Sequence, residues 1–108
     1  MKNILIALSL GLFSTLAIAE GDAAAGKDKS AVCAGCHGMD GISQVGIFPN
    51  LAGQKAEYLI AQLAAFKAGE RTSANSAIMS PMAAGLSEQD IEDLAAYFSS
   101  LDPSGGSR

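Results

Sequence analysis

The spacing of apolar and polar positions predicts two well-formed helices in the second half of the chain. Between Lys55 and Ala68 the larger side chains form a single helical stripe, and Gly69 follows at a position typical of a helix end. A second helix is predicted to begin at Ser87, with Asp90 completing a capping box, and to stop before Pro103. Its apolar face recurs at i, i+3, i+4, i+7 and i+10, at Ile91, Leu94, Ala95, Phe98 and Leu101.

The first half of the predicted domain is less regular. Asp22 can cap a helix from Ala23 to Ala34, which would end at the first cysteine and contain Gly26. A glycine inside a helix costs up to about 1 kcal/mol, so either another helix approaches closely there or the face is simply exposed. The stretches 38–53 and 70–85 lack a helical period and are predicted to be long loops, the first of which is long enough to suggest a function.

The N-terminal residues have the pattern of a secretory signal peptide. A short positive start is followed by an apolar run from Ile4 to Ile18 and a small-residue cleavage pattern that ends at Ala19. The apolar run is shorter than the roughly 20 residues of a spanning helix, although an uncleaved anchor is the alternative. No cysteine lies near Ala19, so a lipid anchor is not expected. The sequence predicts a signal peptide over residues 1–19 and a periplasmic location.

Composition limits the function classes. The chain has 108 residues, a formal net charge of −4 and no tryptophan. An acidic balance disfavours nucleic-acid binding. One domain of this size buries a small core, and a large apolar cofactor would complete it. We therefore expect the chain to fold poorly without its cofactor.

The candidate chemistry is concentrated in Cys33-Ala34-Gly35-Cys36-His37, which contains both cysteines and the single histidine of the chain. A C-x-x-C-H run is typical of covalent haem attachment. The two thiols can form thioether bonds to the two vinyl groups of haem, and the adjacent histidine can then bind the iron. The sequence predicts one haem c held by Cys33 and Cys36, with His37 as an axial ligand.

Other uses of this motif fit less well. A thioredoxin-like redox pair expects a βαβ pattern, and no convincing strand is present. A structural zinc site needs four ligands, and the two cysteines and one histidine supply three. A disulfide across so short a loop would constrain little of the unfolded chain.

The second axial position has two candidates by sequence alone. Methionine is a common partner of histidine in cytochromes c. Met39 is too close to His37 to reach the opposite face, whereas Met79 and Met82 both lie on the predicted 70–85 loop. Pro49 keeps its carbonyl oxygen and is a candidate acceptor for the second ring nitrogen of His37. Gln54, Tyr58 and Arg71 are candidate partners for the haem propionates.

Several motifs together resemble the class I c-type cytochromes, both the small bacterial monohaem kind called c-553 and one half of the dihaem tandem kind. The resemblance covers residues 21–101 and rests on the attachment motif and on Gly21-Asp22-Ala23, Gly26-Lys27, Phe48-Pro49-Asn50-Leu51-Ala52-Gly53-Gln54, Tyr58-Leu59, Gln62-Leu63, Phe66-Lys67-Ala68-Gly69, Met79, Leu86-Ser87 and Ala95-Ala96-Tyr97-Phe98. It implies an all-α fold over residues 20–102. Because Pro103 stops the last helix, a flexible tail is predicted over 103–108. A middle helix and long loops would surround one haem.

The same resemblance assigns roles to particular residues. It implies that Met79, seven residues before Leu86, is the iron ligand opposite His37. It also implies that the Pro49 carbonyl holds His37 and that Leu51 packs on the haem. The first and last helices would cross where Gly26 meets Tyr97 or Leu94. Ser30 departs from the family pattern, which often has an aromatic residue there.

The expected function is soluble one-electron transfer. An iron closed by His37 and Met79 has no open position for a substrate, so we expect no enzyme activity and no small-molecule substrate. The expected partners are redox proteins, namely a membrane electron-transfer complex and a terminal oxidase or reductase, and the expected state is a monomer. A haem enzyme or gas sensor would need an open iron and an acid or base beside it. A permanent subunit of a larger oxidoreductase is the third alternative.

Overall fold

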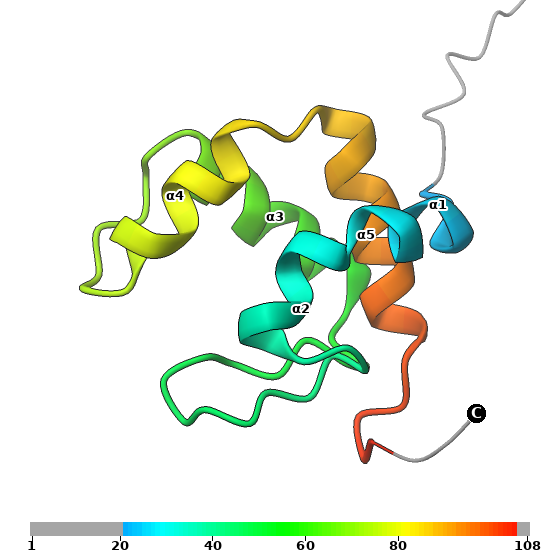
Figure 1. The fold of residues 1–108 in the computed structure, drawn as a ribbon. Helices are drawn as coiled ribbons and strands as arrows, with labels where there is room; N and C mark the ends of the chain where they lie inside the picture. The colour runs from blue at the N-terminus through cyan, green and yellow to red at the C-terminus, as the bar shows by residue number, and fades with distance from the viewer. Residues whose placement is uncertain (1–20, 106–108) are drawn as a thin grey trace, which may run out of the picture.

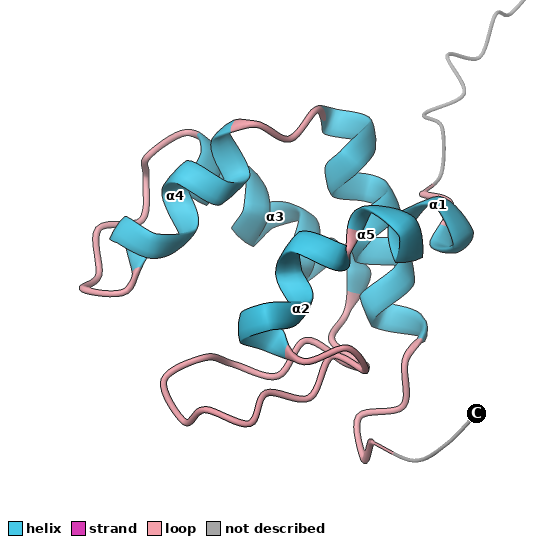
Figure 2. Ribbon diagram, viewed as in Figure 1, coloured by secondary structure: helices cyan, strands magenta, loops and turns pink. Residues whose placement is uncertain are grey.

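The computed structural model describes residues 21–105, and the predicted signal peptide lies outside them. The described chain contains only helices and irregular segments, with no strand (Figures 1 and 2). The helices are α1 (Ala23–Lys29), α2 (Ala31–His37), α3 (Ala56–Lys67), α4 (Ser76–Ala84) and α5 (Glu88–Ser100). None of the helices in this part of the chain is long and apolar enough to cross a membrane.

The first and last helices cross, as the resemblance implied. Figure 1 shows α1 lying against α5, and this pair has the most extensive contact among the helices. A Cβ at Gly26 would lie 2.0 Å from the Asp93 carbonyl oxygen and 2.7 Å from the Tyr97 Cβ. Only a residue without a side chain allows this approach. Of the two partners expected for Gly26, the structure supplies Tyr97, together with the backbone of Asp93.

A charged cluster ties the same crossing together. The Asp93 carboxylate is 3% exposed and accepts hydrogen bonds from the Asp22 backbone N–H at 2.8 Å, Lys29 Nζ at 2.6 Å and Gln89 Nε2 at 2.8 Å. Lys29 also pairs with Asp90 at 2.9 Å. The bond from the Asp22 N–H, followed by those from Lys29 and Gln89, lowers the pKa of Asp93 to about 2.

The predicted ends of the middle and last helices are confirmed. Helix α3 lies within the predicted 55–68 range, and Gly69 follows it with a φ of 71°. Ser87 caps α5, and Ser87 and Asp90 exchange both bonds of a capping box. Helix α5 ends at Ser100, before Pro103.

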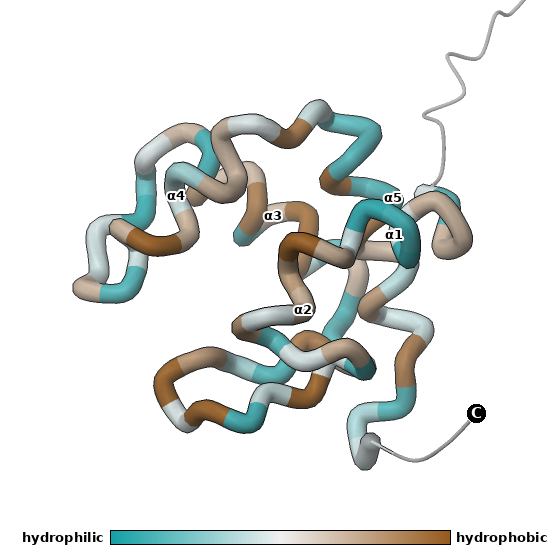
Figure 3. Tube along the Cα trace, in the orientation of Figure 1, coloured by the Kyte–Doolittle hydropathy of each residue, from teal (hydrophilic) through white to brown (hydrophobic). Residues whose placement is uncertain are grey.

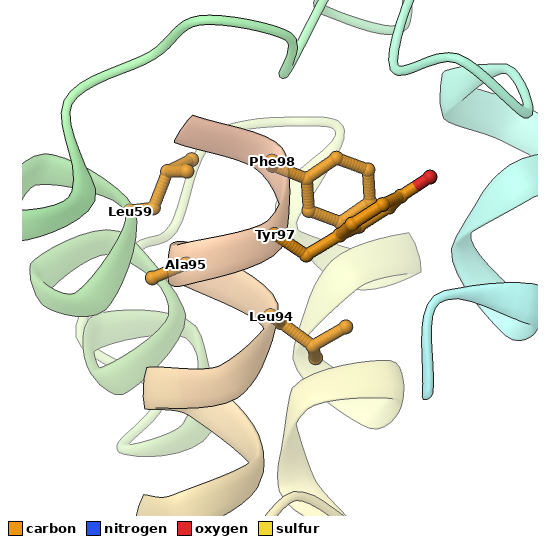
Figure 4. Close-up of a cluster of buried hydrophobic side chains, with 5 residues drawn as sticks. All are labelled: Leu59, Leu94, Ala95, Tyr97 and Phe98. Atoms are coloured by element: carbon orange, nitrogen blue, oxygen red, sulfur yellow. The ribbon is translucent and has the colours of Figure 1, made fainter. Parts of the chain in front are cut away.

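The buried core is built on α5. Four of its side chains, Leu94, Ala95, Tyr97 and Phe98, cluster with Leu59 of α3 (Figure 4). The rings of Tyr97 and Phe98 lie 5.1 Å apart between centroids. Because these side chains of α5 are buried on one face, they recur in the sequence at helical spacing, which made the amphipathic face recognisable.

The prediction of one continuous helix from Ala23 to Ala34 was wrong. The helix breaks at Ser30, whose backbone N–H and side-chain hydroxyl both bond to the Lys27 carbonyl oxygen, at 3.2 and 2.7 Å. A serine hydroxyl that takes up a backbone carbonyl competes with regular helix bonding. The chain then forms α2, which contains the whole C-x-x-C-H motif and ends at His37 rather than at the first cysteine.

The prediction of a loop over residues 70–85 was also wrong in part, because residues 76–84 form α4. Pro81 lies inside this helix, where it removes the hydrogen bond to the Ala77 carbonyl. Ala77 is exposed, so water can satisfy that carbonyl. The helix buries Ser76 and Ala83 and packs on α3, which compensates for the proline. Met79 and Met82 therefore lie on a helix.

Candidate functional site

A single cavity brings the predicted site residues together. It has a volume of about 490 Å³ and is lined by side chains of α2, α3, α4 and α5 and of the segment between α2 and α3. The six residues predicted to bind the cofactor or its iron all line it: Cys33, Cys36, His37, Pro49, Leu51 and Met79. The core residues Leu59, Leu94, Ala95 and Phe98 also form part of its wall. The cavity is therefore an extension of the hydrophobic core.

His37 is the most constrained polar residue of the cavity. It ends α2, is 5% exposed, and its Nδ1 lies 2.8 Å from the Pro49 carbonyl oxygen. A carbonyl can only accept, so Nδ1 carries the proton and donates. The other ring nitrogen, Nε2, keeps its lone pair and can bind a metal. The ring centroid of Phe48 is 6.3 Å from that of His37.

Hydrogen bonds to one glycine, Gly41, close the loop that carries Pro49. The Gly41 carbonyl accepts from the Leu51 N–H at 2.8 Å and the Ala52 N–H at 3.1 Å. Gly41 has a φ of 75°, and a Cβ there would lie 2.9 Å from the Ala52 nitrogen. This closure holds Pro49 and Leu51 at the cavity. The Gly53 N–H donates to the Phe98 carbonyl at 2.9 Å and fixes the loop to α5.

The two cysteines are free thiols on the same helix. Cys33 and Cys36 are both half-buried and both line the cavity. Burial raises the pKa of the Cys33 thiol, with a smaller contribution from Cys36. A spacing of three places both side chains on neighbouring positions of one helix face. The arrangement allows two bonds to one planar group that also faces His37.

The candidate methionines differ in exposure. Met79 and Met82 lie three residues apart on α4, and both line the cavity. Met79 is half-buried, whereas Met82 is 45% exposed. A thioether inside the cavity is better shielded from water than one at its mouth, which favours Met79 over Met82 as a ligand.

Some lining residues were not singled out from the sequence. The clearest are Val32, Ile47, Asn75 and Ile78. The recurrence of Met79, Met82, Ala83 and Leu86 at i, i+3, i+4 and i+7 was the signal that could have revealed the apolar face of α4. Ile47 carries no such signal, because it belongs to an irregular segment.

The residues present fit a haem c. The cavity supplies two unpaired thiols, an imidazole nitrogen with a free lone pair, a thioether and a mainly apolar wall. This donor set suits haem c, because two thiols can attach its vinyl groups and an imidazole nitrogen and a thioether sulfur can both bind its iron. Figure 3 shows apolar segments along α2, along α3 and in the loop that connects them, and residues of all three line the cavity.

Comparisons with known proteins agree with this reading. The family model described as Cytochrome c matches residues 19–102. Cytochrome c-554(548) of Halomonas halodenitrificans is 54% identical over 82 residues, which span 76% of this chain and 99% of that protein. The crystal structure of reduced recombinant cytochrome c4 from Pseudomonas stutzeri superposes with a TM-score of 0.67 at 49% identity, over 76% of this chain and 46% of that one.

A further relative is named for its partner. The thiosulfate dehydrogenase electron acceptor of Thiomonas intermedia is 39% identical over 97% of this chain and 46% of its own length. This chain therefore spans about half the length of that protein and of the cytochrome c4 structure, and nearly all of cytochrome c-554(548).

Proposed function

This chain belongs to the cytochrome c family, whose members carry electrons on a covalently bound haem c, and we propose that it is a periplasmic one-electron carrier with its iron held between His37 and Met79. The observation that carries the proposal is that a half-buried methionine shares one cavity with the oriented His37. Cys33 and Cys36 are the points of attachment. When bound, the haem supplies an iron that gains or loses one electron.

The residues around the iron set its potential. The Pro49 carbonyl fixes the His37 ring, so the Nε2 lone pair is presented without rearrangement. A neutral thioether from Met79 and an apolar wall both disfavour the additional positive charge of ferric iron, which raises the reduction potential. Leu51 and the core residues that line the cavity exclude water from the same region.

Electron transfer without substrate chemistry is supported by the lining residues. The chain has one histidine, and no Asp or Glu is among the residues that line the cavity. A haem enzyme would need an acid or base beside an open iron. Peroxidase-like chemistry would therefore lack a second histidine or a carboxylate at the cavity to serve as that acid or base.

Partner binding is proposed at the mouth of the cavity. Val32, Ile47, Ile78 and Met82 line it and are between 45% and 65% exposed. The segments 30–39, 41–54 and 72–87, which border the cavity, contain no Lys, Arg, Asp or Glu. We infer an apolar contact with another redox protein, small and short-lived as such contacts are, with the chain acting as a monomer. A relative named as the electron acceptor of a dehydrogenase supports a redox enzyme as the donor.

The ligand assignment can be tested by the absorption spectrum of the oxidised holoprotein. We expect a weak near-red band from sulfur-to-iron charge transfer. Met79→Ala should abolish the band, whereas Met82→Ala, the matched control on the same helix, should keep it. The reverse result would assign the ligand to Met82, and no band in the unmodified protein would support an open iron.

A further inference from the structure

The chain continues past α5 and lies against the loop that carries Pro49. Residues 101–105, which we call the C-terminal strap, follow directly on the end of α5. Figure 1 shows this segment in red, passing beside the loop between α2 and α3. The strap begins in the core, because Leu101 packs against the buried cluster. Its last three residues belong to the predicted tail, and they contact the loop at two places.

The first contact is between Pro103 and Gly53. A Cβ at Gly53 would lie 2.7 Å from Pro103 Cδ and 2.9 Å from its Cβ and Cγ, so the proline ring packs directly on the Gly53 backbone. Gly53 also has a φ of 72°, which favours glycine. The N–H groups of Gly53 and Leu101 both donate to the Phe98 carbonyl, at 2.9 and 3.2 Å. The loop and the strap are therefore bonded to the same carbonyl at the end of α5.

The second contact is made by Gly105. A Cβ at Gly105 would lie 3.4 Å from Ile42 Cγ1 and 3.9 Å from Asp40 Oδ2. A turn brings Gly105 to this place: its N–H donates to the Asp102 carbonyl at 3.1 Å, and Asp102 Oδ1 accepts from the Ser104 N–H at 2.9 Å and from its hydroxyl at 2.7 Å. An aspartate that bonds the backbone two residues on stabilises such a turn. The end of the strap thus has a defined shape.

The two contacts lie on the two arms of the loop. Ile42 is on the arm that leaves His37, and Gly53 is on the arm that returns from Pro49. The Gly41 carbonyl joins these arms through its two hydrogen bonds, and the Pro49 carbonyl joins them again by accepting from His37 Nδ1 at 2.8 Å. The strap therefore touches both arms at the base of the loop, where the acceptor of the His37 proton is held.

We propose that the C-terminal strap positions the iron ligand His37 by holding the Pro49 carbonyl against its Nδ1. Pro103 is the main positioning residue, and it acts from outside the site, since none of the described residues that line the cavity belongs to the strap. The proposal rests on the proposed function, because it requires His37 to bind the iron. A firmly held acceptor makes the histidine a more basic ligand, which favours ferric iron, so loosening the loop should raise the reduction potential.

The test compares two shortened holoproteins. One ends at Gly105 and keeps the strap, whereas the other ends at Asp102 and lacks both contacts with the loop. Both lose residues 106–108, so they differ only in the last three residues of the strap. Hydrogen exchange is measured by NMR in the reduced state, because low-spin ferrous iron does not broaden the signals. The reduction potential is measured on the same samples.

Loss of the strap should speed exchange at the His37 Nδ1–H and at the Leu51 amide about tenfold, because the loop then opens locally. The Asp22 amide, which bonds to Asp93 at the α1–α5 crossing, should keep its rate. The reduction potential should rise, which a general loss of stability would not cause. Pro103→Ala in the full chain removes two of the ring atoms that pack on the loop, and should produce the same changes by a smaller factor.

Equal exchange rates at His37 in the two shortened proteins, or equal potentials, would overturn the proposal. Acceleration that includes the Asp22 amide would also overturn it, since the strap would then support the whole fold. If the chain that ends at Asp102 does not accumulate, Pro103→Ala against the unmodified protein decides by the same criteria. None of these results affects the sulfur-to-iron band, which tests the proposed carrier. Absence of that band in the unmodified protein would overturn the ligation by His37 and Met79 instead.

Discussion

The two pairs of helices that matter most in this molecule are held in different ways. Helices α1 and α5 contact each other extensively, through Gly26 and through the cluster around Asp93. Helices α2 and α4 carry the proposed haem ligands. Helix α4 packs on α3, whereas α2 contacts α1, which directly precedes it in the chain, and places Cys33 against the core. Within the described residues α2 and α4 do not contact each other, and the cavity is lined by both. In the proposed holoprotein, the haem would join them.

This difference distinguishes α1 and α5, which form the scaffold, from α2 and α4, which carry the proposed site. The α1–α5 crossing is complete without a cofactor, because its close approach, hydrogen bonds and ion pairs are all made by the protein. We expect the position of α4 relative to α2 to depend on the haem that would fill the space between them. Three predictions test this comparison, in order from the largest expected effect to the smallest.

Preventing haem attachment should have the largest effect. With Cys33→Ala and Cys36→Ala together, we expect no haem to remain after acid extraction. The free energy of unfolding should then fall to about 0–2 kcal/mol, since so small a domain has little core of its own. Hydrogen exchange should be fastest in α2 and α4 and slowest in α1 and α5. A cooperative, native-like transition without haem at room temperature would contradict the comparison.

Gly26→Ala should damage the crossing itself. The added Cβ would lie 2.0 Å from the Asp93 carbonyl oxygen, so the two helices must separate. Such overpacking costs about 1–3 kcal/mol, measurable as a lower midpoint of chemical unfolding of the holoprotein. Gly85→Ala is the matched control, because its φ is −84° and a Cβ there meets nothing within 4 Å. Equal losses in the two variants would show that the crossing is not tightly packed.

Asp93→Asn should change the acid stability of the crossing. The pKa of Asp93 in the folded protein is about 2, below the value of about 3.9 for an unfolded aspartate. The carboxylate therefore stabilises the fold above about pH 4, and this contribution is lost as pH falls toward 2. The asparagine variant should unfold at lower denaturant concentration at pH 7 and show a weaker dependence on pH in that window.

The control for this experiment is Asp28→Asn. Asp28 is exposed on α1, and its side chain takes no part in the hydrogen bonds and ion pairs of the Asp93 cluster. Its acid unfolding should match that of the unmodified protein. If Asp93→Asn retains the full acid dependence, then other carboxylates cause the loss of stability.

The sequence was sufficient for elements whose signals are local. The stripe of α3, the capping box of α5 and Gly69 each depend on residues within a few positions of one another. The attachment motif is also local, because the haem requires its two thiols and its histidine on one turn. For this reason Cys33, Cys36 and His37 could be identified before any fold was known.

The sequence failed where packing outweighed local preference. The stretch 70–85 was predicted to be a loop, and proline is unfavourable inside a helix, yet α4 forms around Pro81 because its apolar face packs on α3 and lines the cavity. Ser30 looked like an ordinary helix position, yet its hydroxyl takes up the Lys27 carbonyl and the helix divides. The first outcome depends on contacts between helices, which a short window of sequence does not contain. The second depends on a local bond between residues three positions apart, whose competition with regular helix bonding the sequence pattern did not reveal.

By itself, then, the sequence determined the cofactor, its attachment and the two longest helices, because covalent chemistry and helix periodicity are written in neighbouring residues. The tertiary structure decided that Met79 is the more shielded methionine, that the Pro49 carbonyl reaches Nδ1 of His37, and that Arg71 is a cation of the cavity wall. These relations join residues from different elements, and only the packing of the helices around one cavity brings them together.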